Sequence, residues 1–463
     1  MNNVCLSFDQ GTLVLSDPKL NEQQIPPGFV RDLRINGQFR APAIAYRRAI
    51  HHLLNAGIKL TDRARNYNEL NLRHRMVREA FPHQQAGFDA WIAAKRRGSV
   101  VLPTGSGKSY LAEMAIAHTQ RSTLVVVPTL DLVAQWARRL SLAFDTHVGT
   151  IGGGTFDVQD LTVSTYDSAY LHMDRLGNRF GLIVFDEVHH LPSESFSQAA
   201  ELAIAPFRLG LTATLERSDG AHTFVDELVG PVVHRQSVTE LRGRYLSDYE
   251  VIRVDIHLSD EERAQYDANR AQYLDFVRSN GIRMGSPQGW QRFIQATCRS
   301  NVGRQAFSAY REQRRIALAS NSKLAVLSQL FANHSQDKTL FFANDNPTVH
   351  AISRQFLVPV ITHETGTKER RRILDGLDTG RWRVLGTSRV LNEGVDMPDV
   401  SVGIIISGTG SVREHVQRLG RILRRREGKR AVLYELVTVD TLDADTSERR
   451  RTHEAYQQEK PEC

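Results

Sequence analysis

Residues 102–109 read Leu-Pro-Thr-Gly-Ser-Gly-Lys-Ser. An apolar run, Ser99–Leu102, leads into this stretch, and a segment of helical composition follows it. The stretch is an imperfect match to the phosphate-binding pattern G-x-x-x-x-G-K-[ST], since Leu102 replaces the first glycine. Glycines let backbone N–H groups approach phosphate oxygens at a helix N-terminus. The alternative interpretation is a glycine turn that happens to precede Lys-Ser. The sequence therefore predicts a nucleotide site formed by Thr104, Gly105, Ser106, Gly107, Lys108 and Ser109.

A second stretch supplies acidic groups directly after a buried strand. Residues 181–187 read Gly-Leu-Ile-Val-Phe-Asp-Glu. We expect Asp186, together with the Ser109 hydroxyl, to hold Mg²⁺ carried by ATP, and Glu187 to polarise the attacking water. A strand capped by acids at a helix start is the ordinary alternative. The presence of both stretches in one α/β domain favours nucleotide hydrolysis, with Lys108 on the β- and γ-phosphates.

Length and composition exclude several classes of protein. The 463 residues correspond to about three domains. The chain is 41% hydrophobic and 24% charged, which is typical of a globular protein. No apolar run approaches the roughly 20 residues that a membrane span needs, and the first residues lack a secretory pattern, so we expect a cytoplasmic protein. Three distant cysteines, Cys5, Cys298 and Cys463, cannot form an all-cysteine zinc site and are expected to be free thiols.

Strand and helix patterns divide the chain into three predicted domains. Residues 1–70 begin with two short apolar runs, Val4–Phe8 and Thr12–Ser16, that predict a hairpin, and the polar stretch Thr61–Arg75 is typical of a linker. Residues 76–240 alternate apolar runs with helix-length segments, which predicts a doubly wound parallel sheet. Residues 241–463 form a second α/β domain that includes an arginine-rich helical segment at 259–320. The charged tail after Leu442 is expected to fray.

A basic segment late in the chain offers positive charge for phosphoryl transfer. Residues 417–424 read Gln-Arg-Leu-Gly-Arg-Ile-Leu-Arg, and Arg421 and Arg424 share one face of a helix. We expect Gln417, Arg421 and Arg424 to act in catalysis, with the two arginines stabilising the transition state. A solvated basic helix or a plain nucleic-acid patch is the alternative.

The order of these stretches resembles that of superfamily 2 nucleic-acid helicases. Their seven motifs match residues 103–109, 128–136, 186–189, 212–214, 341–343, 386–398 and 417–424 in turn. The resemblance implies two RecA-like motor domains, ATP and Mg²⁺ as cofactors, and nucleic acid as partner. It also implies that Asp396 links the nucleotide to domain closure, and that His189 belongs to the DEVH pattern rather than to a metal site.

The closer resemblance is to the XPB branch, the DNA-repair and transcription-factor helicases. It rests on Ser7–Leu15, on Arg40–Pro42, on Asp186–Pro192 followed by Ala205–Thr214, and on Glu261–Ala319, and so covers nearly the whole chain. It implies that residues 1–70 form a small α+β damage-recognition-like DNA-binding domain and that residues 259–320 form a helical thumb. Motif matches further imply DNA contacts through Thr129, Thr165, Thr387 and Arg389.

The chain departs from the branch at one motif. The branch has Arg-Glu-Asp shortly after the third motif, and here the residues are Arg217-Ser218-Asp219. We expect Arg217 and Asp219 to contact DNA still, while Ser218 favours translocation without efficient strand separation.

Further aromatic and polar residues are candidates for contacts with adenine or DNA, and the aromatic ones each have two interpretations. Gln84 is expected to hydrogen-bond adenine; Phe81 either stacks on adenine or, as we favour, packs in a core. Arg292 and Arg304 are expected to bind DNA phosphates from the thumb. Trp290 and Phe293 either stack on bases or pack in the thumb, and packing is favoured for Phe293.

The resulting hypothesis is an ATP-dependent DNA helicase or translocase that moves 3′→5′ in nucleotide-excision-type repair. The alternative is a DNA-stimulated ATPase that remodels distorted duplex and recruits a nuclease. RNA as substrate and a catalytically idle binding protein are disfavoured by the N-terminal resemblance and by the presence of Lys108, Glu187 and Arg421. We expect a monomer or a hetero-complex, associated with the nucleoid and without membrane contact.

Overall fold

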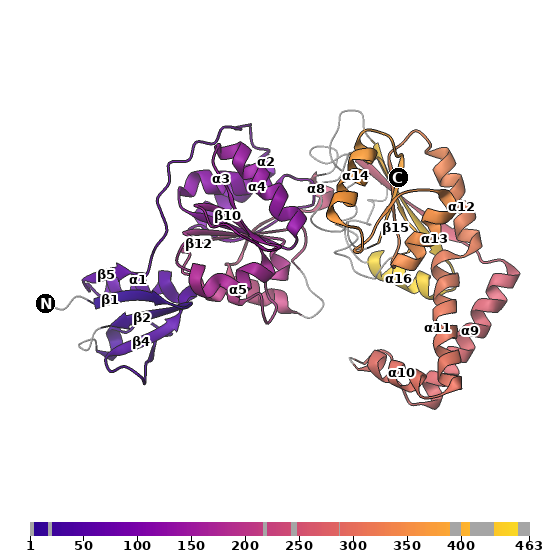
Figure 1. The fold of residues 1–463 in the computed structure, drawn as a ribbon, viewed down its shortest axis with the longest axis horizontal. Helices are drawn as coiled ribbons and strands as arrows, with labels where there is room; N and C mark the ends of the chain where they lie inside the picture. Colours follow the sequence, from indigo (N-terminus) through magenta and orange to yellow (C-terminus); the bar gives the residue numbers. More distant parts are fainter. Residues whose placement is uncertain are drawn as a thin grey trace, which may run out of the picture. The chain divides into compact units, whose positions relative to one another are not determined.

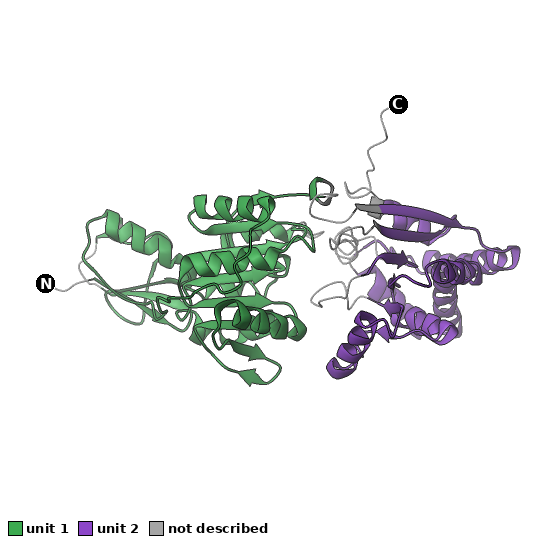
Figure 2. Cartoon of the chain, turned by 90° about the horizontal axis from the view of Figure 1, so that it is seen from above, with its two compact units in different colours: residues 1–241, 394–396 green, residues 242–393, 397–463 purple. Residues whose placement is uncertain are grey.

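The computed structural model describes residues 4–16, 21–215, 220–241, 248–286, 288–388, 400–407 and 430–451. They form two compact units, drawn in green and purple in Figure 2. The first unit holds the described residues up to Leu241, and the second holds the described residues from Asp248 onward.

The first unit begins with a five-stranded sheet in the order β3-β4-β2-β1-β5 (Figure 1). Its elements are β1 (Val4–Asp9), β2 (Thr12–Ser16), β3 (Val30–Arg31), β4 (Gln38–Pro42), β5 (Leu60–Arg63) and helix α1 (Tyr46–Asn55). The predicted hairpin is present as antiparallel β1 and β2. Gly11 in its turn has φ +80°, and a Cβ there would lie 2.6 Å from Leu202 Cδ2. A glycine is needed at this point because the turn packs against the next domain of the same unit.

The predicted linker at Thr61–Arg75 is wrong in two respects. Its first residues belong to β5, which pairs in parallel with β1. The residues after β5 follow the surface of the larger sheet in extended form, held by backbone bonds such as Asn68 N to Ser122 Oγ (2.9 Å) and Leu70 N to Gln120 O (3.0 Å). Gln120 also bonds both backbone groups of Leu72 through its side chain. Polar composition indicated a solvated connection, but these groups bind protein partners instead.

The larger sheet of the first unit has eight strands in the order β13-β6-β12-β11-β7-β10-β8-β9. Only β8 and β9 pair antiparallel, so the predicted parallel sheet is confirmed. The strands are β6 (Arg97–Val101), β7 (Thr123–Val127), β8 (Gly149–Gly152), β9 (Thr155–Phe156), β10 (Leu161–Thr165), β11 (Leu182–Asp186), β12 (Phe207–Thr212) and β13 (Val232–Arg235). The helices are α2 (Pro82–Ala93), α3 (Lys108–Thr119), α4 (Leu130–Phe144), α5 (Tyr166–Leu176), α6 (Gln198–Glu201), α7 (Phe224–Leu228) and α8 (Val238–Leu241).

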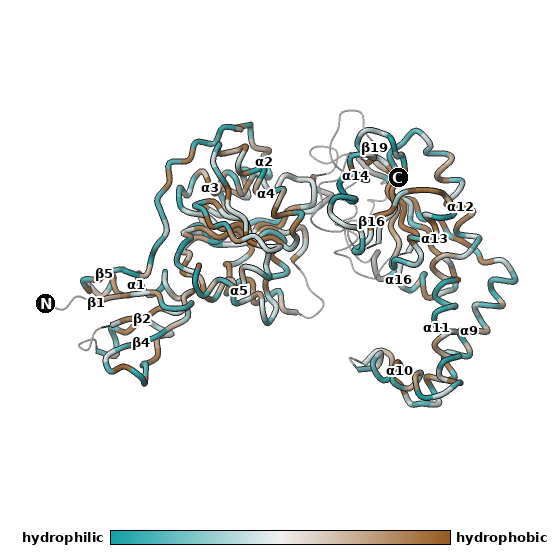
Figure 3. Tube along the Cα trace, in the orientation of Figure 1, coloured by the Kyte–Doolittle hydropathy of each residue, from teal (hydrophilic) through white to brown (hydrophobic). Residues whose placement is uncertain are grey.

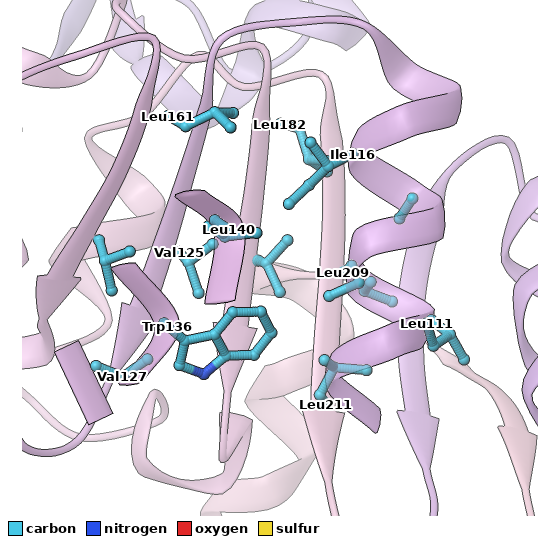
Figure 4. Packing of buried hydrophobic residues seen from close by; sticks show 14 of the residues in the cluster. Leu111, Ile116, Val125, Val127, Trp136, Leu140, Leu161, Leu182, Leu209 and Leu211 are labelled. Carbon is cyan, nitrogen blue, oxygen red and sulfur yellow. The ribbon is translucent and has the colours of Figure 1, made fainter. Parts of the chain in front are cut away.

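Apolar strand residues form the core between this sheet and its helices. Figure 3 shows the hydrophobic residues gathered along the strands, while the covering helices are mixed. On one face, α3 and α4 pack Leu111, Ile116 and Leu140 against Val125 and neighbouring strand residues. Figure 4 shows the Trp136 ring lying among these side chains. Continuous apolar runs in the sequence predicted strands that are buried on both faces. The packing of helices against the sheet explains why these strands are apolar throughout.

Arg208, at the start of β12, is fully buried. Its guanidinium donates to four backbone carbonyls: Ala200 (2.9 Å), Ala203 (2.7 Å), Ala205 (3.2 Å) and Leu228 (2.5 Å). These carbonyls lie in and around the ends of α6 and α7, where helices leave carbonyls without partners of their own. Burial lowers the pKa of Arg208 well below its ordinary value. The arginine thus fixes two helix ends to the first residues of β12.

Arg208→Met is expected to destabilise the first unit by at least about 3 kcal/mol, because it leaves several buried carbonyls without donors. The shift should appear as a lower midpoint of urea unfolding followed by tryptophan fluorescence, since Trp91 Nε1 donates to the Arg208 carbonyl at 2.8 Å. Arg175→Met is the control, because the Arg175 side chain is 80% exposed. A midpoint equal to that of the control would contradict the assigned role.

The second unit contains a six-stranded, all-parallel sheet in the order β14-β19-β18-β15-β17-β16. Its strands are β14 (Asp248–Ile256), β15 (Thr339–Phe342), β16 (Val360–Ile361), β17 (Val384–Thr387), β18 (Val402–Ile405) and β19 (Arg430–Thr438). The helices beside it are α12 (Asn321–Asn333), α13 (Asn346–Phe356), α14 (Thr367–Asp378) and α16 (Leu442–Arg451). Apolar runs in the sequence predict four of these strands, at Thr339–Phe342, Arg383–Leu385, Val402–Ile406 and Ala431–Val437. The strand β14 and the two-residue β16 were not predicted.

The predicted helical segment consists of α9 (Asp260–Ser279), α10 (Gly289–Cys298) and α11 (Asn301–Ala319). Within the second unit, α9 and α11 run side by side away from the sheet, with α10 at their far end (Figure 1). A small apolar cluster that includes Phe276, Val277, Phe293 and Ala306 holds the three helices together.

The expectation that the tail frays after Leu442 is wrong for the residues of α16. Asp443 is fully buried, and its Oδ2 accepts from Lys323 Nζ at 2.7 Å. Lys323 also donates to the Ile406 carbonyl at 2.8 Å, and Ser447 donates to buried Glu435. A charged sequence suggested solvent exposure, but these charges face partners from α12 and β19.

Candidate active site

The predicted phosphate loop lies between β6 and α3. Gly105 and Gly107 have φ of +86° and +84°, which is the left-handed region that favours glycine. The backbone of the loop therefore turns so that α3 begins at Lys108, with the N-terminal N–H groups of the helix at the loop. Lys108 is 9% exposed, and its Nζ donates to the carbonyls of Leu102 (3.0 Å) and Pro103 (3.3 Å). The ammonium thus lies over the loop that is expected to hold phosphates.

Gln84 in α2 contacts the same loop from the side. Its amide nitrogen donates to Ser106 O at 2.8 Å, and its carbonyl oxygen accepts from Phe81 N at 3.0 Å. A Cβ on Gly107 would lie 2.2 Å from the Gln84 amide nitrogen, and the φ of +84° is one that other residues rarely adopt, so glycine is favoured there. His83 Nε2 also lies 2.8 Å from Ser106 O, and burial lowers the pKa of His83. Gln84 and His83 therefore brace the loop, and the adenine contact of Gln84 stays a prediction.

Phe81 is 45% exposed, so the favoured reading of this residue as a core aromatic is wrong. It immediately precedes α2 and stacks on His83 with ring centroids 5.6 Å apart. Phe81 is the N-cap residue, so it precedes the first turn of α2. An exposed aromatic beside the loop is compatible with the stacking alternative.

The acidic pair lies at the carboxyl end of β11. Asp186 is 9% exposed, and its Oδ2 accepts from Trp136 Nε1 at 2.9 Å. Its Oδ1 accepts from Glu187 N at 3.1 Å, and Tyr166 OH donates to its backbone carbonyl at 3.0 Å. Glu187 has φ +50°, a strained conformation that is common at functional sites. The carboxylate of Asp186 is thus fixed in orientation by Trp136 of α4 and by the Glu187 backbone, while Tyr166 of α5 holds its main chain.

Thr212, at the end of β12, joins the acidic pair to the next motif. It is fully buried, and its hydroxyl donates to Thr214 O at 2.7 Å. Thr212 Oγ1 lies 2.9 Å from His189 Nδ1 and 3.4 Å from Glu187 Oε2. His189 Nδ1 in turn lies 3.5 Å from Glu187 Oε2. These contacts give Glu187 a defined position and link it to residues 212–214.

Sequence reasoning missed the roles of Trp136 and Tyr166. Trp136 is 50 residues from its partner Asp186, and nothing in the local sequence signals that contact. A useful signal would have been the buried indole itself, because a buried Trp N–H needs an acceptor. Trp136 is only 3% exposed and belongs to the sheet–helix core.

The donor set fits ATP with Mg²⁺. Ser109 and Asp186 offer hydroxyl and carboxylate oxygens, the ligands that Mg²⁺ prefers, and Mg²⁺ commonly takes its remaining ligands from phosphates and water. No group of three or more His, Cys, Asp or Glu side chains suited to a metal exists among the described residues. Ser109 and Asp186 would supply two oxygen ligands, which suits a metal that takes its other ligands from phosphates and water.

The predicted DNA-contact threonines cap helices at strand ends. Thr129 is the N-cap of α4 and Thr165 is the N-cap of α5, and their hydroxyls accept from Leu132 N (3.3 Å) and Ser168 N (3.1 Å). Thr165 is 6% exposed and Thr387 is fully buried at the end of β17. The DNA contacts of these three threonines stay predictions.

The thumb candidates have the exposure that DNA contacts need. Arg292 in α10 and Arg304 in α11 are exposed, and each contacts a neutral amide side chain, Gln288 and Asn301 respectively. Phe293 is fully buried, so its predicted packing role is confirmed. Trp290 is 45% exposed and stays available for stacking.

Comparison with known families identifies the chain. The damage recognition domain model of the xeroderma pigmentosum group B helicase matches residues 6–64, and the ERCC3/RAD25/XPB C-terminal helicase model matches residues 304–458. The model for the res subunit of type III restriction enzymes matches residues 78–217. The chain is 39% identical over 422 residues to the DNA 3′-5′ translocase XPB2 of Sulfurisphaera tokodaii, covering 85% of this chain and 96% of that protein. The chain belongs to the XPB family.

Other relatives and solved structures agree with XPB membership. The DNA 3′-5′ helicase XPB of Mycobacterium tuberculosis is 30% identical over 389 residues, covering 81% of this chain but only 63% of that protein. The helicase domain of Pyrococcus furiosus Hef superposes with a TM-score of 0.52 at 16% identity, covering 79% of this chain and 98% of that one. Saccharomyces cerevisiae Dbp5 gives 0.56 at 15% identity, covering 81% and 88%. These structures share the RecA-like helicase fold, which confirms the predicted fold class.

Seven predicted site residues of this XPB-family chain lie outside the described residues. They are Arg217, Asp219, Arg389, Asp396, Gln417, Arg421 and Arg424. Their roles remain predictions from the motif matches. The search for helices long and apolar enough to cross a membrane found none in the described part of this XPB-family chain.

Proposed function

We propose that this chain is an ATP-dependent DNA helicase or translocase that moves 3′→5′ in DNA repair. The chain is an enzyme of the XPB family that hydrolyses ATP and acts on DNA. The observation that carries this function is the alignment of motifs on one sheet edge. The phosphate loop, Thr129, Thr165, Asp186 and Thr212 all lie at the carboxyl ends of β6, β7, β10, β11 and β12.

Residues at this edge divide the chemistry of ATP hydrolysis. Mg²⁺, held by Ser109 and Asp186, would neutralise phosphate charge. Lys108 leaves the carbonyls of Leu102 and Pro103 to bind the terminal phosphates, and the amides of the loop bind further phosphate oxygens. Glu187 accepts a proton from the attacking water, in the position that Thr212 and His189 define. Gln84 and the exposed Phe81, which lie beside the loop, are the proposed contacts to adenine.

The predicted second motor domain, residues 241–463, supplies the remaining groups in this proposal. Arg421 and Arg424 place positive charge on the developing phosphate, Gln417 orients them, and Asp396 links the nucleotide to closure of the two motor domains. ATP then acts as a ligand with higher affinity for the closed state, and its hydrolysis releases that state. Arg292, Arg304, Arg217, Asp219 and Arg389 contact DNA, mainly at phosphates, without reading sequence.

The second candidate is a DNA-stimulated ATPase that remodels distorted duplex with little strand separation and recruits a nuclease. The residue that favours it is Ser218, which stands where the family motif has Glu. In this reading the chain works in a hetero-complex, whereas a self-sufficient helicase would work as a monomer. Both candidates place the chain on DNA in the cytoplasm, at the nucleoid.

The two candidates are separated by measuring ATP hydrolysis with single-stranded, forked and duplex DNA, with displacement of a labelled strand followed in parallel. Stimulation together with displacement of the fork supports a helicase in which Ser218 is tolerated. Stimulation by duplex without displacement supports the remodelling candidate. The absence of stimulation by every DNA would contradict both.

A further inference from the structure

Exposed apolar side chains gather at the turn between β3 and β4. Leu33 is 95% exposed, Ile35 is 48% exposed and Val30, in β3, is 67% exposed. A single exposed leucine is ordinary, but three within six residues of one hairpin are not explained by packing. The apolar groups are displayed to solvent at the edge of the N-terminal sheet, where β3 is the outermost strand.

The turn is rigid because a buried carboxylate organises it. Asp32 is 7% exposed; its Oδ1 accepts from Arg34 N and Nε (both 3.0 Å), and its Oδ2 accepts from Arg34 Nη2 (2.9 Å) and Arg40 Nε (2.6 Å). These bonds hold the pKa of Asp32 well below its ordinary value, so it stays ionised. The backbone closes through Asp32 N to Gln38 O at 2.8 Å. Leu33 and Ile35 are thus presented on an ordered loop.

The root of the turn is fixed to the domain core. Phe29 is buried in the N-terminal core, and Phe39 packs against the same cluster from β4. Arg40 joins the turn to the first hairpin through Thr12 Oγ1 (2.9 Å) and Asp9 Oδ2 (2.8 Å). A displayed side chain on a fixed support loses little conformational entropy on binding, which favours a binding role.

The charges around the tip select the kind of partner. Residues 28–40 contain three arginines and one aspartate, and that aspartate is the buried Asp32. Arg31 and Arg34 are exposed on either side of Leu33, and the Arg34 side chain is 71% exposed. An apolar tip between two cations matches the combination with which proteins insert into a DNA base step while holding the flanking phosphates.

We propose that the turn at residues 32–37 is a wedge that inserts Leu33 and Ile35 into duplex DNA where base stacking is already broken. Arg31 and Arg34 bind the phosphates on either side. Insertion requires unstacking, which costs least at a mismatched, damaged or unpaired step, so the wedge makes the protein prefer distorted duplex. This inference rests on the proposed action on DNA and adds the residues that would recognise the distortion.

The test compares the full chain with the double variant Leu33→Ala/Ile35→Ala. Dissociation constants are measured by fluorescence anisotropy for a fully paired duplex and for the same duplex with a central unpaired bubble. The wild type should bind the bubble duplex more tightly, and the double variant should lower that preference about tenfold, the scale of one lost base contact. Leu33→Glu should lower it as well. The control is Leu54→Ala, because Leu54 is 59% exposed on α1 of the same domain.

The outcomes separate failure of the wedge from failure of the proposed function. A double variant with the wild-type preference overturns the wedge, and it would leave a protein partner as the occupant of this surface. A wild type whose ATP hydrolysis is not stimulated by any DNA overturns the proposed function and the wedge with it. Loss of the preference in both tip variants but not in Leu54→Ala supports the inference.

Discussion

Glu187→Gln is expected to lower kcat for ATP hydrolysis by about 10³-fold, the range found when a general base is removed. Glu187 Oε2 lies 3.4 Å from Thr212 Oγ1 and 3.5 Å from His189 Nδ1. Gln has nearly the same shape as Glu, so the surroundings of residue 187 are preserved. The amide cannot accept the proton of the attacking water. ATP affinity should remain, because the phosphate loop is untouched. Steady-state hydrolysis and the affinity for a fluorescent ATP analogue measure the two properties separately.

The control for this variant is Glu194→Gln, which changes an exposed carboxylate shortly after the acidic pair. It should hydrolyse ATP at the wild-type rate. Loss of nucleotide binding in Glu187→Gln would contradict the role of Glu187 as base and would assign it to binding instead.

Lys108→Ala should abolish nucleotide binding and lower ATP turnover by at least about 10³-fold, as removal of a charged donor to a developing phosphate charge does. The structure places the Lys108 ammonium over the carbonyls of Leu102 and Pro103. Truncation therefore removes the cation without altering the glycine conformations that shape the loop. The measurement is binding of the fluorescent ATP analogue, followed by hydrolysis at one ATP concentration that saturates the wild type.

Lys59→Ala is the matched control, since Lys59 is exposed in the N-terminal domain. Turnover by Lys108→Ala close to that of this control would show that the phosphate site was assigned to the wrong loop.

The sequence predicted the two sheets because their strands are continuous apolar runs buried on both faces. The apolar runs Thr123–Val127 and Thr339–Phe342 coincide with β7 and β15, and the motif residues fall at the strand ends that a parallel sheet brings together. Local patterns sufficed for these elements, because both the strand and the turn that follows it are encoded within a few residues.

Contacts between distant residues could not be read from the sequence in the same way. Asp186 is oriented by Trp136, and Arg208 bonds carbonyls at the ends of α6 and α7, yet neither pairing has a local pattern. The charges of Asp443 and the polar stretch around Asn68 suggested solvent, because composition does not reveal a buried partner such as Lys323 or Ser122. These misses all involve polar groups that tertiary structure satisfies.

The most direct test of the account is the direction of ATP-driven movement on single-stranded DNA. Streptavidin is bound to a biotin at either the 3′ or the 5′ end of an oligonucleotide, and its displacement is followed with ATP in excess. We predict faster displacement from the 5′ end, as a 3′→5′ motor requires, and no displacement by Glu187→Gln. Equal rates at both ends, or faster displacement from the 3′ end, would contradict the central claim.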